Sequence, residues 1–430
     1  MKNTSRLLAG VHIPRFFQAR QIFPTEHIAP EDIPVIVHQE LDKPGIREQF
    51  KPGMRIAITA GSRGLSQYVL ILRSIVAYCK ERGTDPFVIP AMGSHGGADA
   101  EGQRKILEGY GITEASIHCP IISSMETALI GKTETGRDVY IDKHAAEADG
   151  IIVFNRVKPH TCFEGPVQSG LMKMMAIGLA KQYGAQHCHE RGYAVLGDSI
   201  IEYGRGILQN ANVLLGFATI ENAYDEVHSL TAVRPEAIFD VESELQPISR
   251  RLMPRILVDE CDVLVVDEVG KNFSGDGMDP NITGTFCTPY AHGGIRSQRV
   301  CVLDLSPETH GNGMGVGMAQ CTTRRCFEKL DLDEMYPNAI TSVEVGSTRI
   351  PPIMENDREA IQFAIRTLEN VTEENARIVR IPNSQFIQHI LLSEHYYEQV
   401  KARDDMEIES DLFELPFDEN GNLTIPRIRS

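Results

Sequence analysis

Apolar and polar positions follow two different periods along the first half of the chain. Three short runs rich in β-branched and aromatic residues predict buried strands, at residues 55–59, 86–90 and 150–155. Between them, residues 65–81 and 99–110 carry apolar side chains at helical spacing, and each stretch stops before a glycine, Gly83 or Gly111. Strands that alternate with helices in this way predict an α/β fold with a mainly parallel sheet.

The pattern continues to the end of the chain and starts afresh near Pro254. Further strands are predicted at residues 34–38, 128–141 (a pair with a turn), 213–220, 261–267, 299–305 and 376–381. Further helices are predicted at residues 193–208, 235–252, 318–330 and 356–368. A chain of 430 residues exceeds one ordinary core, so we expect two α/β domains, residues 1–254 and 255–405. The tail, residues 406–430, is expected to pack back on the first domain.

Three strands of the first domain each end in a loop that carries one distinctive polar residue: Arg63, His95 or His160. Ligands of open α/β sheets bind beyond the carboxyl ends of the strands, so parallel neighbouring strands would bring the three side chains together. Arg63 suits a phosphate, and His160 suits proton transfer as a general acid or base. The glycines on both sides of His95 allow the backbone to approach a ligand closely. The structural alternatives are a surface ion pair for Arg63, a tight turn for His95 and a hydrogen-bonding role for His160.

The stretch of residues 155–192 holds two further candidates. Lys173 precedes an apolar helix start, which suggests a partly buried amine held for covalent attachment or for an anion, although most lysines lie at the surface. His187 and His189 flank Cys188, and imidazole and thiolate both bind late transition metals. Adjacent residues cannot all reach one ion, so a single histidine ligand is the better reading, and two exposed loop histidines are the alternative.

The composition of the chain excludes some classes of binding partner. The net charge of −17 argues against nucleic acid and against anionic membranes, and no apolar run is long enough to span a membrane. The nine cysteines have no disulfide-like spacing, which fits reduced thiols in the cytoplasm. The sequence therefore predicts a cytoplasmic protein that binds a small molecule.

Taken together, these motifs resemble the nickel-pincer lactate racemase family, whose members racemise or epimerise 2-hydroxy acids. The resemblance is best over residues 50–200. It implies two α/β domains with the active site in the cleft between them. It also implies a pyridinium-3,5-bisthiocarboxylic acid mononucleotide with nickel as the cofactor, a hydroxy acid substrate and enzymes that synthesise the cofactor as partners. The identity of the hydroxy acid and a homo-oligomeric state are left open.

The resemblance also implies a role for each motif residue. The motif of residues 169–173 makes Lys173 the covalent attachment point, with Ser169 and Gly170 beside it. The remaining roles are cofactor phosphate binding for Arg63, acid–base catalysis for His95 and His160, and nickel ligation for His189 rather than His187. The family's substrate glutamine and lysine have no clear counterpart, but the loop of residues 270–281 occupies their place, so Lys271 and Asn272 are the expected substrate contacts in the second domain.

Two other classes of function remain open. A metal hydrolase would use His95, His160 and His189 around a zinc-bound water. A non-catalytic, ligand-binding relative would have lost the cofactor, and Ala60, which stands where the family has an aspartate, keeps that alternative open.

Overall fold

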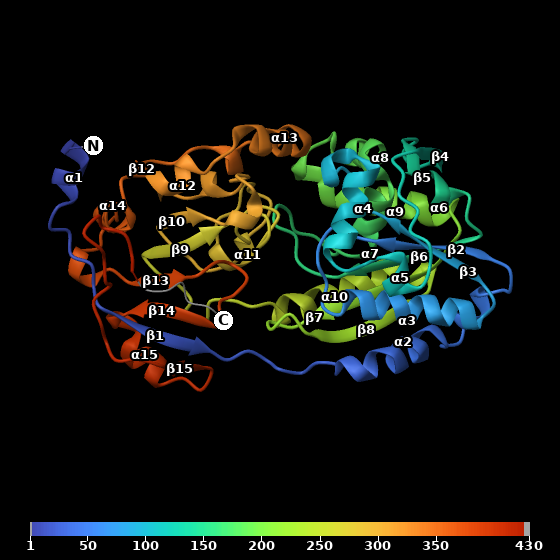
Figure 1. Ribbon diagram of the computed structural model, residues 1–430, viewed down its shortest axis with the longest axis horizontal. Coiled ribbons are helices and arrows are strands. Elements are labelled where there is room, and N and C mark those ends of the chain that lie inside the picture. The colour runs from blue at the N-terminus through green and yellow to red at the C-terminus, as the bar shows by residue number, and fades with distance from the viewer. Residues whose placement is uncertain (1, 425–430) are drawn as a thin grey trace. The chain divides into compact units, whose positions relative to one another are not determined.

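The computed structural model describes residues 2–424, which form two compact units. The middle unit is Pro24–Met253. The terminal unit combines the two ends of the chain, residues 2–23 and 254–424. Both units are α/β with largely parallel sheets, as the sequence predicts (Figure 1). In the described part of the chain, no helix is both long and apolar enough to cross a membrane.

The middle unit is built on a five-stranded sheet in the order β3-β2-β6-β7-β8. Its strands are β2 (Arg55–Ala60), β3 (Asp85–Pro90), β6 (Gly150–Arg156), β7 (Val213–Glu221) and β8 (Val227–Val233), and a separate hairpin contains β4 (Thr127–Lys132) and β5 (Asp138–Asp142). The first four strands of this order are parallel, and β8 pairs antiparallel with β7. The predicted adjacency of the first three strands is therefore confirmed.

Helices cover both faces of this sheet because its strands are apolar on both sides. On β2, Ile56 and Ile58 enter one core with α2 and α3, whereas Ala57 enters a second core with α7, α9 and α10. The helices are α2 (Ile33–Leu41), α3 (Tyr68–Glu81), α4 (Ala100–Gly109), α5 (Glu114–Ile117), α6 (Lys143–Ala146), α7 (Leu171–Lys173), α8 (Lys181–His189), α9 (Leu196–Asn210) and α10 (Ile238–Leu252). Burial on both faces is typical of a parallel sheet.

The terminal unit contains an eight-stranded sheet in the order β12-β11-β10-β9-β13-β14-β1-β15. Its strands are β1 (Phe16–Gln21), β9 (Val263–Val269), β10 (Arg299–Leu305), β11 (Cys321–Thr323), β12 (Ile353–Met354), β13 (Ile378–Ile381), β14 (His389–Ser393) and β15 (Met406–Ile408). Its helices are α1 (Lys2–Leu8), α11 (Pro280–Thr283), α12 (Arg324–Glu328), α13 (Leu332–Ser342), α14 (Asp357–Arg366) and α15 (Tyr397–Lys401). The strands from β12 to β13 run parallel, and β14, β1 and β15 add antiparallel pairs.

The N-terminal segment departs from the predicted division of the chain. The sequence predicts residues 1–254 as the first domain, but β1 pairs with β14 and β15 and so belongs to the terminal unit. The described part of the tail, residues 406–424, lies in the same unit rather than on the middle unit. The sequence does not indicate that β1 pairs with β14 and β15, because no local pattern predicts the pairing of strands that lie so far apart in the chain.

Two predicted elements are wrong. Residues 34–38 form part of helix α2, because Ile33, Val37 and Leu41 are buried at a spacing of four and Pro34 stands at the helix start. Their β-branched side chains suggested a strand. The helix predicted at residues 318–330 is instead strand β11 followed by the short helix α12. There Thr323 caps α12 by accepting a hydrogen bond from the Cys326 amide.

Candidate active site

The loops after β2 and β3 contact each other beyond the carboxyl ends of these parallel strands. The Ser62 hydroxyl is hydrogen-bonded to Nδ1 of His95, which joins the two loops directly. Arg63, the next residue after Ser62, and His95 are both exposed. The structure thus brings the Arg63 and His95 segments together, as the strand arrangement predicts.

The loop that carries His160 is closed at its base by a two-residue bridge. Lys158 and Ser169 exchange both backbone hydrogen bonds, at 2.7 and 3.1 Å, so the chain returns directly to Ser169 and Gly170. Within the loop, the His160 amide donates to Oε1 of Gln168 at 2.8 Å. The bridge places His160 next to the segment that begins the Lys173 helix.

The ring of His160 is held in one orientation. Its Nδ1 accepts the backbone N–H of Cys162 at 3.0 Å, and its ring centroid lies 4.4 Å from that of Phe163. A backbone amide only donates, so Nδ1 carries no proton and the proton of the neutral ring sits on Nε2. Desolvation lowers the pKa of His160 well below its ordinary value, and the charges of Lys173 and His189 lower it further. Near neutral pH, His160 is therefore a neutral ring that donates through Nε2.

Lys173 ends the single turn α7, and a π-helical turn, Met174–Leu179, continues from it. Such turns are frequent at functional sites. The start of α7 is fixed from two sides. Nδ2 of Asn155, on β6, donates to the Gly170 carbonyl at 2.9 Å, and Oε2 of Glu242, on α10, accepts the Met172 amide at 2.8 Å. Lys173 itself is half-buried, as the sequence suggests.

Glu242 is a site residue that the sequence analysis missed. Its side chain is fully buried, and this desolvation raises its pKa to about 7, although backbone amides of Met172 and Leu171 oppose the shift. A signal existed in the pattern, because Glu242 and Gln246 occupy the buried face of α10 where apolar residues are expected. A polar residue on an apolar helix face indicates a specific buried partner.

Glu242 also explains why residue 170 is a glycine. A Cβ atom at Gly170 would lie 2.3 Å from Oε1 of Glu242. We expect Gly170→Ala to destabilise the protein by about 1–3 kcal/mol, because the added methyl group displaces the carboxylate that holds α7. Gly109→Ala is the control, since a Cβ at this helical glycine meets nothing within 4 Å. Urea unfolding checks the prediction, and equal stability of the two variants would contradict it.

The two candidate metal histidines on α8 have different surroundings. Nδ1 of His189 donates to the Ala185 carbonyl, 2.8 Å away, because a carbonyl can only accept. Nδ1 therefore bears the proton, and Nε2 keeps its lone pair. Burial lowers the pKa of His189, and the Lys173 charge lowers it further, which places this histidine near the lysine. His187 instead stacks on Tyr140, with ring centroids 5.7 Å apart, and contacts Tyr183.

The predicted substrate residues Lys271 and Asn272 follow β9 in the terminal unit, whereas the other predicted site residues belong to the middle unit. Nζ of Lys271 is hydrogen-bonded to the side chain of Asn338, and its amide donates to the Thr309 hydroxyl at 3.1 Å. Asn272 is exposed. These contacts within the terminal unit hold the loop in place.

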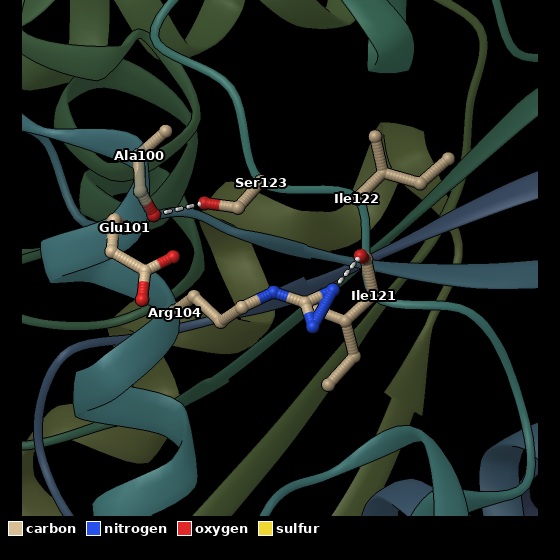
Figure 2. A pocket seen from close by; sticks show the side chains of 6 residues that line it. All are labelled: Ala100, Glu101, Arg104, Ile121, Ile122 and Ser123. Carbon is tan, nitrogen blue, oxygen red and sulfur yellow. Dashed lines mark hydrogen bonds between the residues drawn. The ribbon is translucent and has the colours of Figure 1, made fainter.

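A surface hollow of about 320 Å³ lies beside the start of α4 (Figure 2). Its lining residues are Ala100, Glu101, Arg104, Ile121, Ile122 and Ser123. Arg104 spans it to donate to the Ile121 carbonyl at 2.8 Å, and Ser123 donates to the Ala100 carbonyl at 2.6 Å. None of the predicted site residues lines this hollow.

Part of the chain is similar to a known protein family. Residues 14–197 match the model of the lactate racemase N-terminal domain. This part of the chain belongs to the lactate racemase N-terminal domain family. The matched segment contains Arg63, His95, His160, Lys173 and His189, and the predicted resemblance to the lactate racemase family is confirmed.

The fold of the chain is also similar to that of a solved structure. The lactate racemase apoprotein from Thermoanaerobacterium thermosaccharolyticum aligns with a TM-score of 0.54 and 14% sequence identity, over 86% of this chain and 99% of that chain. At this identity the likeness concerns the fold alone. No curated protein matches the chain.

Proposed function

We propose that this protein racemises or epimerises a 2-hydroxy acid, with a nickel-pincer nucleotide held covalently on Lys173. The family of residues 14–197 supports the isomerase class. The observation that carries the proposal is the grouping of an amine and two imidazoles. The bridge between Lys158 and Ser169 brings the His160 loop to the start of α7, which ends at Lys173. In keeping with this, the Lys173 charge lowers the pKa of both His160 and His189.

The donor set fits such a cofactor. The hydrogen bond from Nδ1 of His189 to Ala185 leaves Nε2 as the metal-binding nitrogen, an outer contact of the kind that orients histidine ligands in metal sites. Lys173 supplies the amine for attachment, and its helix start is fixed by Asn155 and Glu242. When bound, the group supplies a metal and a ring carbon that can accept and return hydride.

The chain's own residues handle the proton and the substrate oxygen. His160 is neutral with the proton on Nε2, so it donates to the oxygen of the substrate. His95 is exposed, and its Nδ1 is hydrogen-bonded to the Ser62 hydroxyl. We assign His95 the role of the base. Two proton-transfer groups on different loops can serve opposite faces of one carbon, as inversion requires. Arg63, beside Ser62, is proposed to bind phosphate.

The zinc-hydrolase alternative finds less support. In the described residues, the ring nitrogens of His95, His160 and His189 do not gather within 4.8 Å of one another. A zinc ion needs its ligand atoms about 2.0–2.1 Å from one centre, so these side chains would have to rearrange. The non-catalytic alternative is tested by turnover.

The direct test of the proposal is inversion of configuration. The protein is produced together with cofactor-synthesis enzymes and nickel, then incubated with single enantiomers of a panel of 2-hydroxy acids. Chiral chromatography should show the opposite enantiomer accumulating. Binding of a hydroxy acid without any inversion would favour the non-catalytic alternative, and hydrolysis with zinc alone would favour the hydrolase.

The two histidines of α8 separate the metal ligand from its neighbour. We expect His189→Ala to lower both nickel content and activity, by about 10-fold or more, because a metal ligand is removed. His187→Ala is the matched control, since His187 packs on Tyr140 and Tyr183 instead. Elemental analysis of both variants checks the prediction. Greater nickel loss in His187→Ala would mean that the assignment of the ligand is wrong.

A further inference from the structure

A second lysine, Lys181, lies eight positions after Lys173 and has no place in the proposed chemistry. Its side chain is fully buried, which is rare for a lysine. Its backbone has a φ of +55°, the left-handed conformation that residues with a side chain rarely adopt. A buried ammonium held at a strained position requires a specific set of partners.

The partners of Lys181 match its three N–H donors. Nζ lies 2.5 Å from the Pro90 carbonyl at the end of β3, 3.3 Å from Oε1 of Gln103 on α4, and 3.2 Å from Oδ2 of Asp142 at the end of β5. Gln103 and Asp142 are also fully buried. The ammonium therefore joins three segments of the middle unit through two hydrogen bonds and one ion pair.

The network continues to the backbone of His95. Nε2 of Gln103 donates to the carbonyls of Gly93 and His95, at 3.0 and 3.1 Å. Because the carboxamide oxygen of Gln103 faces the ammonium, its nitrogen is directed to these carbonyls. Lys181 thus sets the orientation of a side chain that holds the His95 backbone.

The His95 loop needs such support. Gly93, Gly96 and Gly97 all have positive φ, so the loop contains three of the most flexible residues available. The His95 side chain is exposed, so few packing contacts fix it. The π-helical turn is hydrogen-bonded to the same loop, since the Gly93 amide donates to the Gly178 carbonyl at 3.2 Å.

We propose that Lys181 and Gln103 are positioning residues that fix the His95 loop relative to the helix segment carrying Lys173 and His189. The catalytic meaning of this inference rests on the proposed function, but the coupling itself does not. Lys173 and Lys181 begin and end the same π-containing segment. Lys173 carries the proposed attachment of the cofactor. Lys181 is buried and links the segment to the His95 loop.

The alternative is an ion pair that only stabilises the fold. Buried ion pairs often contribute little net stability, so unfolding measurements cannot separate the two roles. The separating property is local order of residues 93–98 in a protein that remains folded. Gln103→Leu removes the link to the His95 carbonyl. Lys181→Met combined with Asp142→Asn removes both charges while Oδ1 of residue 142 can still cap α6, where it accepts the His144 and Ala145 amides.

The experiment uses the full-length protein without cofactor. Hydrogen exchange followed by mass spectrometry reports on residues 91–98, and imidazole NMR reports on His95, assigned by the loss of its signal in His95→Asn. Lys105→Met is the control, because Lys105 lies on α4 with a side chain that is 70% exposed. In Gln103→Leu and in the double variant, exchange in this loop should rise by about tenfold or more and the His95 signal should move.

The contrary result is a folded Gln103→Leu variant with wild-type exchange in the loop and an unchanged His95 signal, which would overturn the inference. If the double variant does not fold, Gln103→Leu alone decides. In the loaded enzyme, kcat should fall in Gln103→Leu while His189→Ala, and not Gln103→Leu, loses nickel. A wild-type enzyme that inverts no hydroxy acid would refute the proposed function and leave the exchange result standing.

Discussion

Lys173→Ala is expected to lack the covalent nucleotide completely and to show no racemisation. The amine is the only group of the 169–173 motif that can form an amide-type bond, and alanine offers no nucleophile. Intact mass spectrometry after production with the cofactor-synthesis enzymes should show an added, sulfur-containing mass on the wild type and none on the variant.

Two further variants make this test specific. Lys173→Arg keeps a positive charge of similar length but cannot form the same bond, so it should also lack the adduct. Lys105→Ala, at an exposed lysine of α4, should carry the adduct normally. Racemisation by a preparation whose Lys173 is unmodified would exclude covalent attachment here.

The strand-end loops could be predicted from the sequence because their signals are local. A buried β-branched run followed by glycine and one polar residue marks both the strand and its carboxyl end. The parallel order of β2, β3 and β6 then follows from the alternation with helices. The contact between Ser62 and His95 is a consequence of that order.

Residues that act through long-range burial could not be predicted in the same way. Lys181 follows an apolar stretch, and its sequence position alone is typical of an exposed lysine at the start of a helix. Its three partners nevertheless come from β3, α4 and β5. Glu242 lies some 70 positions from the Met172 amide that it accepts. In both cases the polar side chain is stable only because the fold supplies its partners. The polar positions on the buried face of α10 indicate that Glu242 has a buried partner, but they do not indicate which group it is.

Replacement of His160 is expected to lower racemisation by about two to four orders of magnitude. The structure makes this prediction more detailed than the residue type alone. Because the Cys162 amide occupies Nδ1, the catalytic nitrogen is Nε2, and it carries the proton when the ring is neutral. A glutamine carboxamide can place a donor near the position of Nε2 but cannot accept or release a proton at neutral pH.

The comparison of His160→Ala with His160→Gln therefore separates binding from proton transfer. Both variants should lose kcat, whereas His160→Gln should keep a KM closer to the wild type because the hydrogen bond to the substrate oxygen survives. His38→Ala, at a half-exposed histidine of α2, is the control and should racemise normally. Steady-state kinetics with each enantiomer gives both constants, and stopped-flow absorbance of the loaded enzyme shows whether one half-reaction persists. Wild-type kcat in both His160 variants would show that His160 transfers no proton, and the catalytic assignment would then pass to other groups near Lys173.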